Sequence, residues 1–196
     1  PVYNLKGMGI GSRVIASATD YAQAQTAGHF WSTLLDGAHV SSDVAVIDGE
    51  PRWWRHATGE TTGDGTFDHW LVRAEDDPAV EDWCGAWCRR HLRGYTGMVN
   101  LETIGGRIIE VHLRFADQWP DLYGEGWVDA VGRLYHAGTW DFPDPDRRDG
   151  VSVVLFEPHG AHYRHPPEAV VERVRRMADI SSVQITFHED KDPGQH

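Results

Sequence analysis

The sequence lacks long apolar runs, clusters of basic residues and abundant cysteine, and each absence removes a class of function. No stretch approaches the roughly 18 continuous apolar residues that a membrane helix needs, and the start PVYNLKGMG has neither the charged nor the apolar region of a signal peptide. Lysine and arginine form no stripe in a chain of formal net charge −12, which argues against binding to nucleic-acid phosphates or anionic lipid. We therefore expect a cytoplasmic protein with no nucleic-acid partner and no membrane partner.

The two cysteines, Cys84 and Cys88, lie four residues apart in a segment with helical spacing, so a disulfide between them would close only one turn. A reducing compartment fits this usage. Nine Trp, six Tyr and six Phe supply large apolar surfaces, and 196 residues suffice for one compact domain or for a domain with a small attached lobe. We therefore expect the chain to fold around a substantial core.

Alternating apolar and polar residues predict a mainly antiparallel sheet with flanking helices. Asp48-Gly49 is a hairpin turn between two alternating runs, and Pro78 and Pro167 each open a segment with apolar residues at helical spacing. A third helix is expected at residues 125–136. Further strands are expected at VYNL, RVIAS, VSVVLFEP and SSVQITF, in addition to the hairpin described next. The predicted fold class is α+β.

The segment GYTGMVNLETIGGRIIEVHLRF, residues 94–115, is typical of a β-hairpin with one apolar face and one polar face. Residues that lie opposite each other in an antiparallel pair project from the same side of the sheet. For the apolar sides to coincide, Leu101 must lie opposite Val111. This register places Glu102 opposite Glu110.

The same register places Asn100 opposite His112 at the next position along the polar face. It leaves Gly105, Gly106 and Arg107 in the turn, which is then of the bulged, glycine-containing type. Four polar side chains are therefore expected to converge on one side of the hairpin.

Two carboxylates that face each other repel unless a cation lies between them. A hard divalent cation such as Mg²⁺ takes carboxylate and amide oxygens and shares its coordination sphere with nucleotide phosphates. We therefore predict a metal site at Glu102 and Glu110, with Asn100 or His112 as a further ligand. The alternative is a sheet face that is polar because water covers it.

The segment KGMGIGS near the start carries Gly7, Gly9 and Gly11 at alternate positions between two strand-like segments. It is not a P-loop, because GK[ST] is absent, and it fails the dinucleotide-binding fingerprint. Backbone N–H groups on such a loop can still surround phosphate oxygens, with Lys6 as a point charge. A glycine hairpin without a ligand is the alternative.

With the glycine loop ahead of it, the hairpin resembles the ATP-grasp superfamily of ATP-dependent carboxylate ligases. In order along the chain, NLKGMGIGSRVI looks like the phosphate-loop strands, LLDGAHVSSDVAVIDGE like the L-x-G-x-E-x-S-x-D segment that contains Leu35, and EVHLR like the E-x-N-x-R metal segment. The resemblance implies an ATP-grasp-like fold, with a partial nucleotide-binding lid subdomain at residues 1–36 and the metal and substrate subdomain at residues 37–196. The family's N-terminal domain is missing, so we expect the chain to be part of a longer ligase.

The resemblance further implies an ATP- and Mg²⁺-dependent ligase that joins a carboxylate to an amine or a thiol through an acyl phosphate. Glu102, Glu110 and Asn100 would hold the metal. His112 stands where the family has Asn, which makes it either a metal ligand or a donor to phosphate and admits Mn²⁺ as the preferred ion. Arg114, together with His112, would serve catalysis by neutralising charge on the transferring phosphoryl group. The residues implied for nucleotide binding are Lys6, Gly7, Gly9, Gly11 and Leu35, together with Arg55 and His56, which a surface strand explains equally well.

Two alternatives remain open from the sequence. The chain would bind a nucleotide or a partner without turnover if the missing domain is essential for catalysis. A zinc-dependent hydrolase is the other alternative, because FEPHGAHYRH offers Glu157, His159, His162 and His165 to Zn²⁺, although without strict helical spacing. The expected partners are small-molecule carboxylates with amines or thiols, and the sequence leaves a homodimer open.

Overall fold

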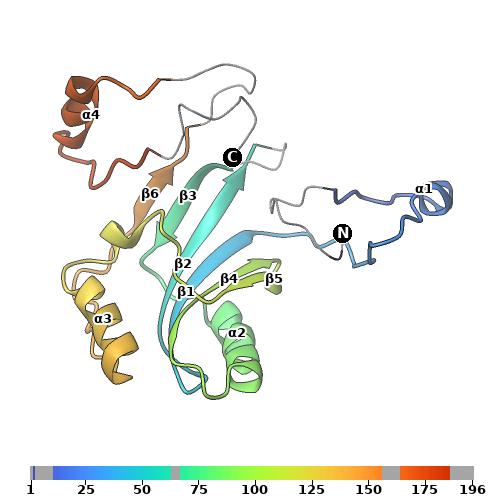
Figure 1. The fold of residues 1–196 in the computed structure, drawn as a ribbon, viewed down its shortest axis with the longest axis horizontal. Helices are drawn as coiled ribbons and strands as arrows, with labels where there is room; N and C mark the ends of the chain where they lie inside the picture. Colours follow the sequence, from blue (N-terminus) through green and yellow to red (C-terminus); the bar gives the residue numbers. More distant parts are fainter. Residues whose placement is uncertain (1, 3–10, 63–66, 156–163, 186–196) are drawn as a thin grey trace.

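A computed structural model describes residues 2, 11–62, 67–155 and 164–185 of the protein. These residues form a six-stranded sheet with the strand order β5-β4-β1-β2-β3-β6 (Figure 1). Every neighbouring pair of strands is antiparallel, so the predicted α+β class is confirmed. The elements in chain order are α1 (Ala18–Gln23), β1 (His39–Ile47), β2 (Glu50–Thr61), β3 (Phe67–Arg73), α2 (Pro78–His91), β4 (Gly97–Ile104), β5 (Arg107–His112), a 3₁₀ turn (Pro120–Leu122), α3 (Trp127–Ala137), β6 (Gly150–Val153) and α4 (Glu168–Arg175).

Helix α2 covers one face of the sheet. It begins after Asp77, whose side chain accepts a hydrogen bond from the N–H of Val80, and Pro78 occupies its first turn as the sequence predicts. Its buried side packs against β1 and β4: Val80, Cys84 and Cys88 contact the cluster of Val44, Val46, Val99 and Leu101. Both cysteines are free, and burial raises the pKa of Cys84 to about 12 and that of Cys88 to about 11. They are core residues and not reactive thiols.

The opposite face carries a larger, aromatic core, which α3 and the preceding segment close. Trp119, Tyr123, Trp127 and Leu134 pack onto Ala45, Trp53 and Met98 of the sheet. Helix α3 buries Ala130 with Trp127 and Leu134, while Val128 and Tyr135 are exposed. In Figure 1, α2 and α3 accordingly lie on opposite sides of the strands.

The register of the β4–β5 hairpin agrees with the prediction, but its turn does not. Glu102 pairs with Glu110, and Asn100 with His112. The turn has two residues, since Ile104 pairs with Arg107, and Gly105 and Gly106 both have positive φ, at 56° and 75°. Such a turn favours glycine at both positions because other residues pay for the left-handed conformation.

The extra residue of the hairpin lies within β5 and not in the turn. The pairing shifts between Glu102 and Thr103, so Ile109 has no partner opposite it and is exposed. Ile108 and Val111 pack towards the α2 core in its place. Strict alternation from Val111 would place Ile109 on the apolar face, and the bulge is the reason that it is exposed.

Two expected strands are absent from the part of the chain that the structure describes. Residues 13–17 and 181–185 have no regular secondary structure, and no described strand pairs with either segment. An isolated strand leaves its backbone hydrogen bonds to solvent, so apolar composition alone does not fix it. The VYNL strand falls largely outside the described residues.

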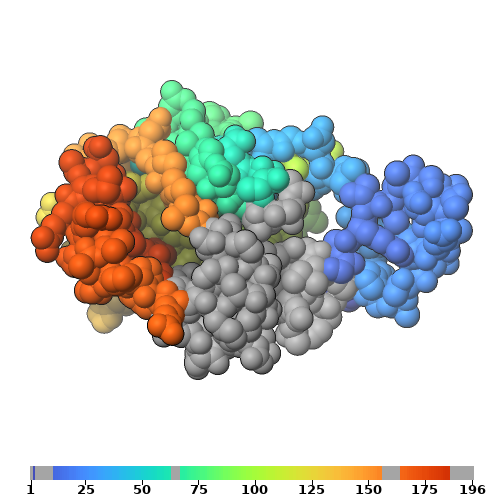
Figure 2. Space-filling model, turned by 90° about the horizontal axis from the view of Figure 1, so that it is seen from above, coloured from blue at the N-terminus to red at the C-terminus, as the bar shows by residue number. Residues whose placement is uncertain are grey.

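Residues 11–36 extend from the start of β1 to one end of the molecule, opposite the end that carries α4 (Figures 1 and 2). This segment contains α1, whose N-cap is Ser17, with a side chain that accepts a hydrogen bond from the N–H of Asp20. The division of the chain at residue 36 stays a prediction. Within the described ranges, no helix combines the length and the apolar character needed to cross a membrane.

Candidate functional site

The candidate site lies on the face of the sheet that α3 only partly covers. The aromatic core occupies the half of this face around Ala45, and the half towards His39 carries polar side chains. Asp43 on β1 lies opposite Asn100 on β4, and Ser41 lies opposite Glu102. Since opposite residues share a face, these strands and β5 bring one polar surface together, which is buried at Ser41, Asp43 and Asn100 and open to solvent at Glu110.

Three predicted ligands converge on this surface. Glu102, Glu110 and His112 each offer one ligand atom, and these atoms all lie within 4.8 Å of one another. His112 Nε2 lies 3.3 Å from Glu110 Oε1. The Glu110 side chain is 54% exposed, so the trio opens to solvent and can be reached by a ligand.

The charges of the trio suit a divalent cation. Two unit charges about 4 Å apart repel by about 1 kcal/mol in bulk water and by about 4 kcal/mol near a protein surface. A cation between Glu102 and Glu110 would replace this repulsion with attraction. Carboxylate oxygens suit Mg²⁺ and Mn²⁺, and an imidazole nitrogen favours Mn²⁺ over the harder Mg²⁺. The donor set therefore fits the ion that the sequence led us to expect.

His39 is a neighbour of the trio that the sequence reasoning missed. Its Nε2 lies 3.0 Å from Glu102 Oε2, and its ring meets Phe67 and Trp70 edge to face at centroid distances of 5.0 and 5.5 Å. The sequence did contain a signal for it: His39, Ser41 and Asp43 recur at every second residue of β1, the period of one strand face.

Asn100 belongs to a different, buried network. Its side-chain nitrogen donates to Ser41 Oγ at 2.9 Å and to Asp43 Oδ1 at 2.8 Å. The Asp43 carboxylate, 1% exposed, also accepts hydrogen bonds from the N–H of Ala116 and the hydroxyl of Tyr123. Burial raises the pKa of Asp43 to about 7, although its donors act in the opposite direction. These hydrogen bonds hold the segment that follows β5 against the sheet.

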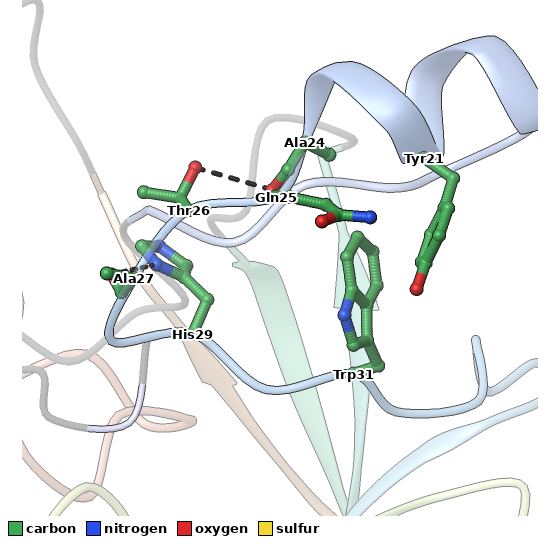
Figure 3. A pocket seen from close by; sticks show the side chains of 7 residues that line it. All are labelled: Tyr21, Ala24, Gln25, Thr26, Ala27, His29 and Trp31. Atoms are coloured by element: carbon green, nitrogen blue, oxygen red, sulfur yellow. Dashed lines mark hydrogen bonds between the residues drawn. The ribbon is translucent and has the colours of Figure 1, made fainter.

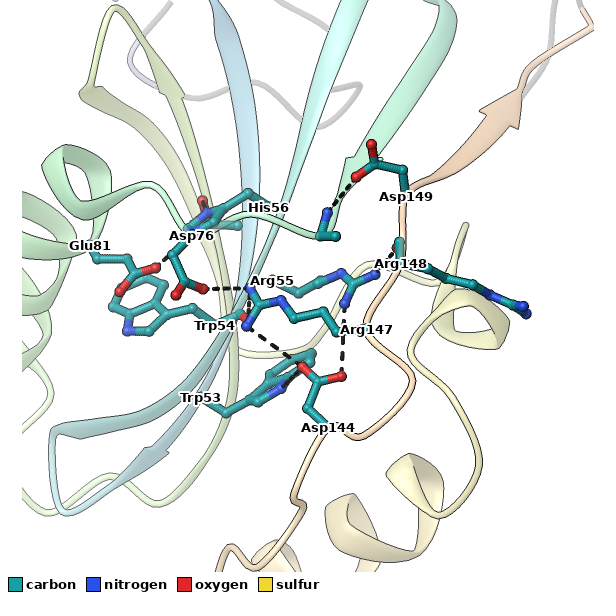
Figure 4. A network of polar contacts seen from close by, with 12 residues as sticks. Trp53, Trp54, Arg55, His56, Asp76, Glu81, Asp144, Arg147, Arg148 and Asp149 are labelled. Carbon is teal, nitrogen blue, oxygen red and sulfur yellow. Dashed lines mark hydrogen bonds and ion pairs between the residues drawn. The ribbon is translucent and has the colours of Figure 1, made fainter.

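Arg55, which the resemblance implied for nucleotide binding, is enclosed by an ion-pair network (Figure 4). Its side chain is fully buried, donates to the carbonyl of Arg148 and lies 3.8 Å from Asp144, which also pairs with Arg147. Burial lowers the pKa of Arg55, and the charge of Asp144 opposes this effect. Arg55 therefore holds residues 144–148 against the sheet and does not face an open surface.

His56 lies on the other face of the sheet, against α2. Its Nδ1 is 2.9 Å from Ser42 Oγ, and its Nε2 is 3.1 Å from Glu81 Oε1 (Figure 4). Burial lowers the pKa of His56, and the contact with Glu81 opposes this. Because Arg55 and His56 are adjacent in β2, they project to opposite faces and do not line one pocket together.

Arg114 lies two residues beyond the end of β5 and is exposed, with one guanidinium nitrogen donating to the carbonyl of Phe115. Leu35 is half-buried just before β1. Gly11 is exposed with a φ of 86°, a conformation that favours glycine. Lys6, Gly7 and Gly9 lie outside the described residues, as do Glu157, His159 and His162 of the zinc alternative.

A hollow of about 330 Å³ lies between α1 and the segment that follows it (Figure 3). In it the rings of Tyr21 and Trp31 lie 4.9 Å apart. The lining residues are Tyr21, Ala24, Gln25, Thr26, Ala27, His29 and Trp31. They include no carboxylate and no guanidinium, and they lie in the 11–36 segment, so the hollow is separate from the polar surface described above.

No protein-family model matches the chain, and no curated protein matches it. Among solved structures, it is similar to the crystal structure of an L-amino acid ligase from Bacillus licheniformis, with a TM-score of 0.51 and 12% sequence identity. The fold is ATP-grasp-like. The match covers 71% of this chain and 41% of the ligase, so the chain spans less than half of that protein's length.

Proposed function

We propose that the chain is the metal-binding part of an ATP-dependent ligase that joins a carboxylate to an amine or a thiol through an acyl phosphate. The observation that carries the proposal is the convergence of Glu102, Glu110 and His112 within 4.8 Å on an open sheet face. The ATP-grasp-like fold, shared with an amino acid ligase, supports the same reading.

In this proposal, Glu102 and Glu110 would hold the ion through carboxylate oxygens, and His112 would hold it through a ring nitrogen. Bound Mg²⁺ or Mn²⁺ supplies the positive charge that offsets the charge of the ATP phosphates. Arg114, two residues beyond His112, is exposed and adds a permanent positive charge beside them. Asn100 can take part only through its amide oxygen, because its nitrogen is bound to Ser41 and Asp43.

The balanced reaction has two steps. A carboxylate oxygen of the substrate bonds to the γ-phosphorus of ATP and ADP leaves, which gives the acyl phosphate. An amine or thiol then bonds to the acyl carbon and gives up a proton to solvent, and inorganic phosphate leaves with the oxygen that bound it. The side chains of this chain contribute charge and position, which are the main protein contributions in phosphoryl transfer.

A second candidate is a module that binds nucleotide or a partner without turnover. The short match supports it, because the chain spans only 41% of the ligase that it resembles. Under the ligase candidate the partners are small-molecule carboxylates with amines or thiols, and a homodimer is one assembly to test. Measuring ATP consumption with panels of carboxylates and amines separates the two, since the module binds ATP and leaves it intact.

Isothermal titration of ATP, with and without Mg²⁺, tests the proposed site. The wild type is expected to bind ATP more tightly with Mg²⁺, and Glu110→Ala is expected to lose this metal dependence because one of two acidic ligands is gone. Glu60→Ala, an exposed glutamate on β2 that projects from the other sheet face, is the matched control and should behave as the wild type. Metal-dependent binding that survives in Glu110→Ala would refute the assignment.

A further inference from the structure

We infer that His39 is a positioning residue for the metal site: it holds the Glu102 carboxylate in the orientation that meets Glu110 and His112. The inference rests on the proposed function, because it assigns a role to a residue beside the same site. His39 offers no ligand atom to the trio itself. It acts on the site through Glu102.

The contact between the two side chains has a defined direction. An ionised carboxylate only accepts hydrogen bonds, so at 3.0 Å the Nε2 of His39 must be the donor. A carboxylate has two oxygens with two lone-pair sites each. Glu102 can therefore accept from His39 and still offer oxygen to a cation.

The His39 ring is itself held by aromatic side chains from β3. Phe67 and Trp70 meet it at interplanar angles of 74° and 79°. Strand β2 lies between β1 and β3, so these rings must reach across a strand spacing of about 9–10 Å. The orientation of the imidazole therefore depends on the size of the β2 side chain that lies between His39 and the two aromatic rings.

Gly59 is the residue that leaves room for this contact. It lies opposite His39 on one side and opposite Trp70 on the other. A Cβ at this position would lie 2.8 Å from ring atoms of Phe67 and 2.9 Å from Trp70. Three facing residues on neighbouring strands thus form a row: His39, Gly59 and Trp70. Gly59 has no side chain, and the rings of Phe67 and Trp70 occupy the space above it.

The physical consequence concerns the free energy of placing Glu102. Without the donor, the Glu102 side chain keeps its rotamer freedom and is repelled by Glu110. Part of the binding free energy of the ion is then used to order this side chain, which weakens the observed affinity. Donors that orient metal ligands typically contribute 10- to 100-fold in metal affinity. His39 is expected to contribute in this range.

Titration of the protein with Mn²⁺ alone, followed by electron paramagnetic resonance of the free ion, tests the inference without requiring turnover. His39→Leu keeps an apolar contact with Phe67 and Trp70 but has no donor, and we expect it to bind Mn²⁺ about 10- to 100-fold more weakly. His39→Gln places an N–H near the position of Nε2 and is expected to stay within about 3-fold of the wild type. His69→Leu, a histidine of β3 that pairs with Asp68 away from the trio, is the control and should not change the affinity.

Gly59→Ala gives a second, independent variant. Its new methyl group displaces Phe67 and Trp70, so Mn²⁺ affinity should fall in the same direction as in His39→Leu. Circular dichroism of each variant checks that it is folded.

The outcomes separate this inference from the proposed function. If Glu102→Gln and Glu110→Gln bind Mn²⁺ like the wild type, the proposed metal site is wrong. If these two variants lose the ion and His39→Leu keeps wild-type affinity, only the role of His39 is wrong. Equal losses in His39→Leu and His39→Gln would also overturn it, because they would make His39 a direct ligand or a purely structural residue.

Discussion

Asp43 and Glu110 are both acidic residues on the same face of the sheet, yet their surroundings differ. Asp43 is 1% exposed and accepts hydrogen bonds from Asn100, Tyr123 and the backbone of Ala116. Glu110 is 54% exposed, lies opposite Glu102 and contacts only His112 among the described polar groups. The first carboxylate has its donors within the protein, and the second faces another carboxylate.

The polar face of the sheet therefore has a structural part around Asp43 and a candidate ligand-binding part around Glu110. A buried carboxylate surrounded by donors stabilises the segment that supplies those donors. An exposed pair of carboxylates gains nothing from its closeness until a cation binds. Position in the strand pattern is the same for both, so the donors around each group decide its role.

The largest effect is expected from Asp43→Ala. The substitution leaves the Tyr123 hydroxyl, the Ala116 N–H and the Asn100 amide without their acceptor inside the core. Each buried unsatisfied group costs about 1–3 kcal/mol, so we expect the free energy of unfolding to fall by about 3 kcal/mol or more. Urea denaturation followed by tryptophan fluorescence measures it.

The control is Asp82→Ala, an exposed aspartate on α2, which should stay within about 0.5 kcal/mol of the wild type. If Asp43→Ala were as mild as this control, the buried network would not hold the segment after β5. Asp43 would then have no larger structural role than an exposed carboxylate.

A much smaller effect is expected from Glu110→Gln in metal-free protein. The change removes repulsion between facing carboxylates and also weakens the contact with His112, so the free energy of unfolding should change by no more than about 0.5 kcal/mol. Urea denaturation in the presence of a chelator measures it. A loss of about 2 kcal/mol or more would show that Glu110 stabilises the fold as Asp43 does.

Much of the sheet could be predicted because its signals are local. Alternation fixed the facing pairs Glu102 with Glu110 and Asn100 with His112, and Asp48-Gly49 marked the β1–β2 turn. The ATP-grasp-like fold followed from the order of several weak motifs. These features depend on residues close together in the chain.

The remaining features depend on contacts between distant segments. The bulge at Ile109 arises from how β5 meets the α2 core, and the hairpin sequence alone fits a three-residue turn equally well. Arg55 appeared available for a ligand until the 144–148 segment was seen to enclose it. Its partners lie more than 80 residues away in sequence, so no local pattern could indicate them.

Mn²⁺ binding by the wild type, Asp43→Asn and Glu110→Gln, measured side by side by electron paramagnetic resonance, tests the central claim most directly. We expect one ion per chain in the wild type and in Asp43→Asn, and loss of that ion in Glu110→Gln. Wild-type binding in Glu110→Gln, together with its loss in a folded Asp43→Asn, would refute the proposed metal site, because the buried carboxylate would then be the ligand.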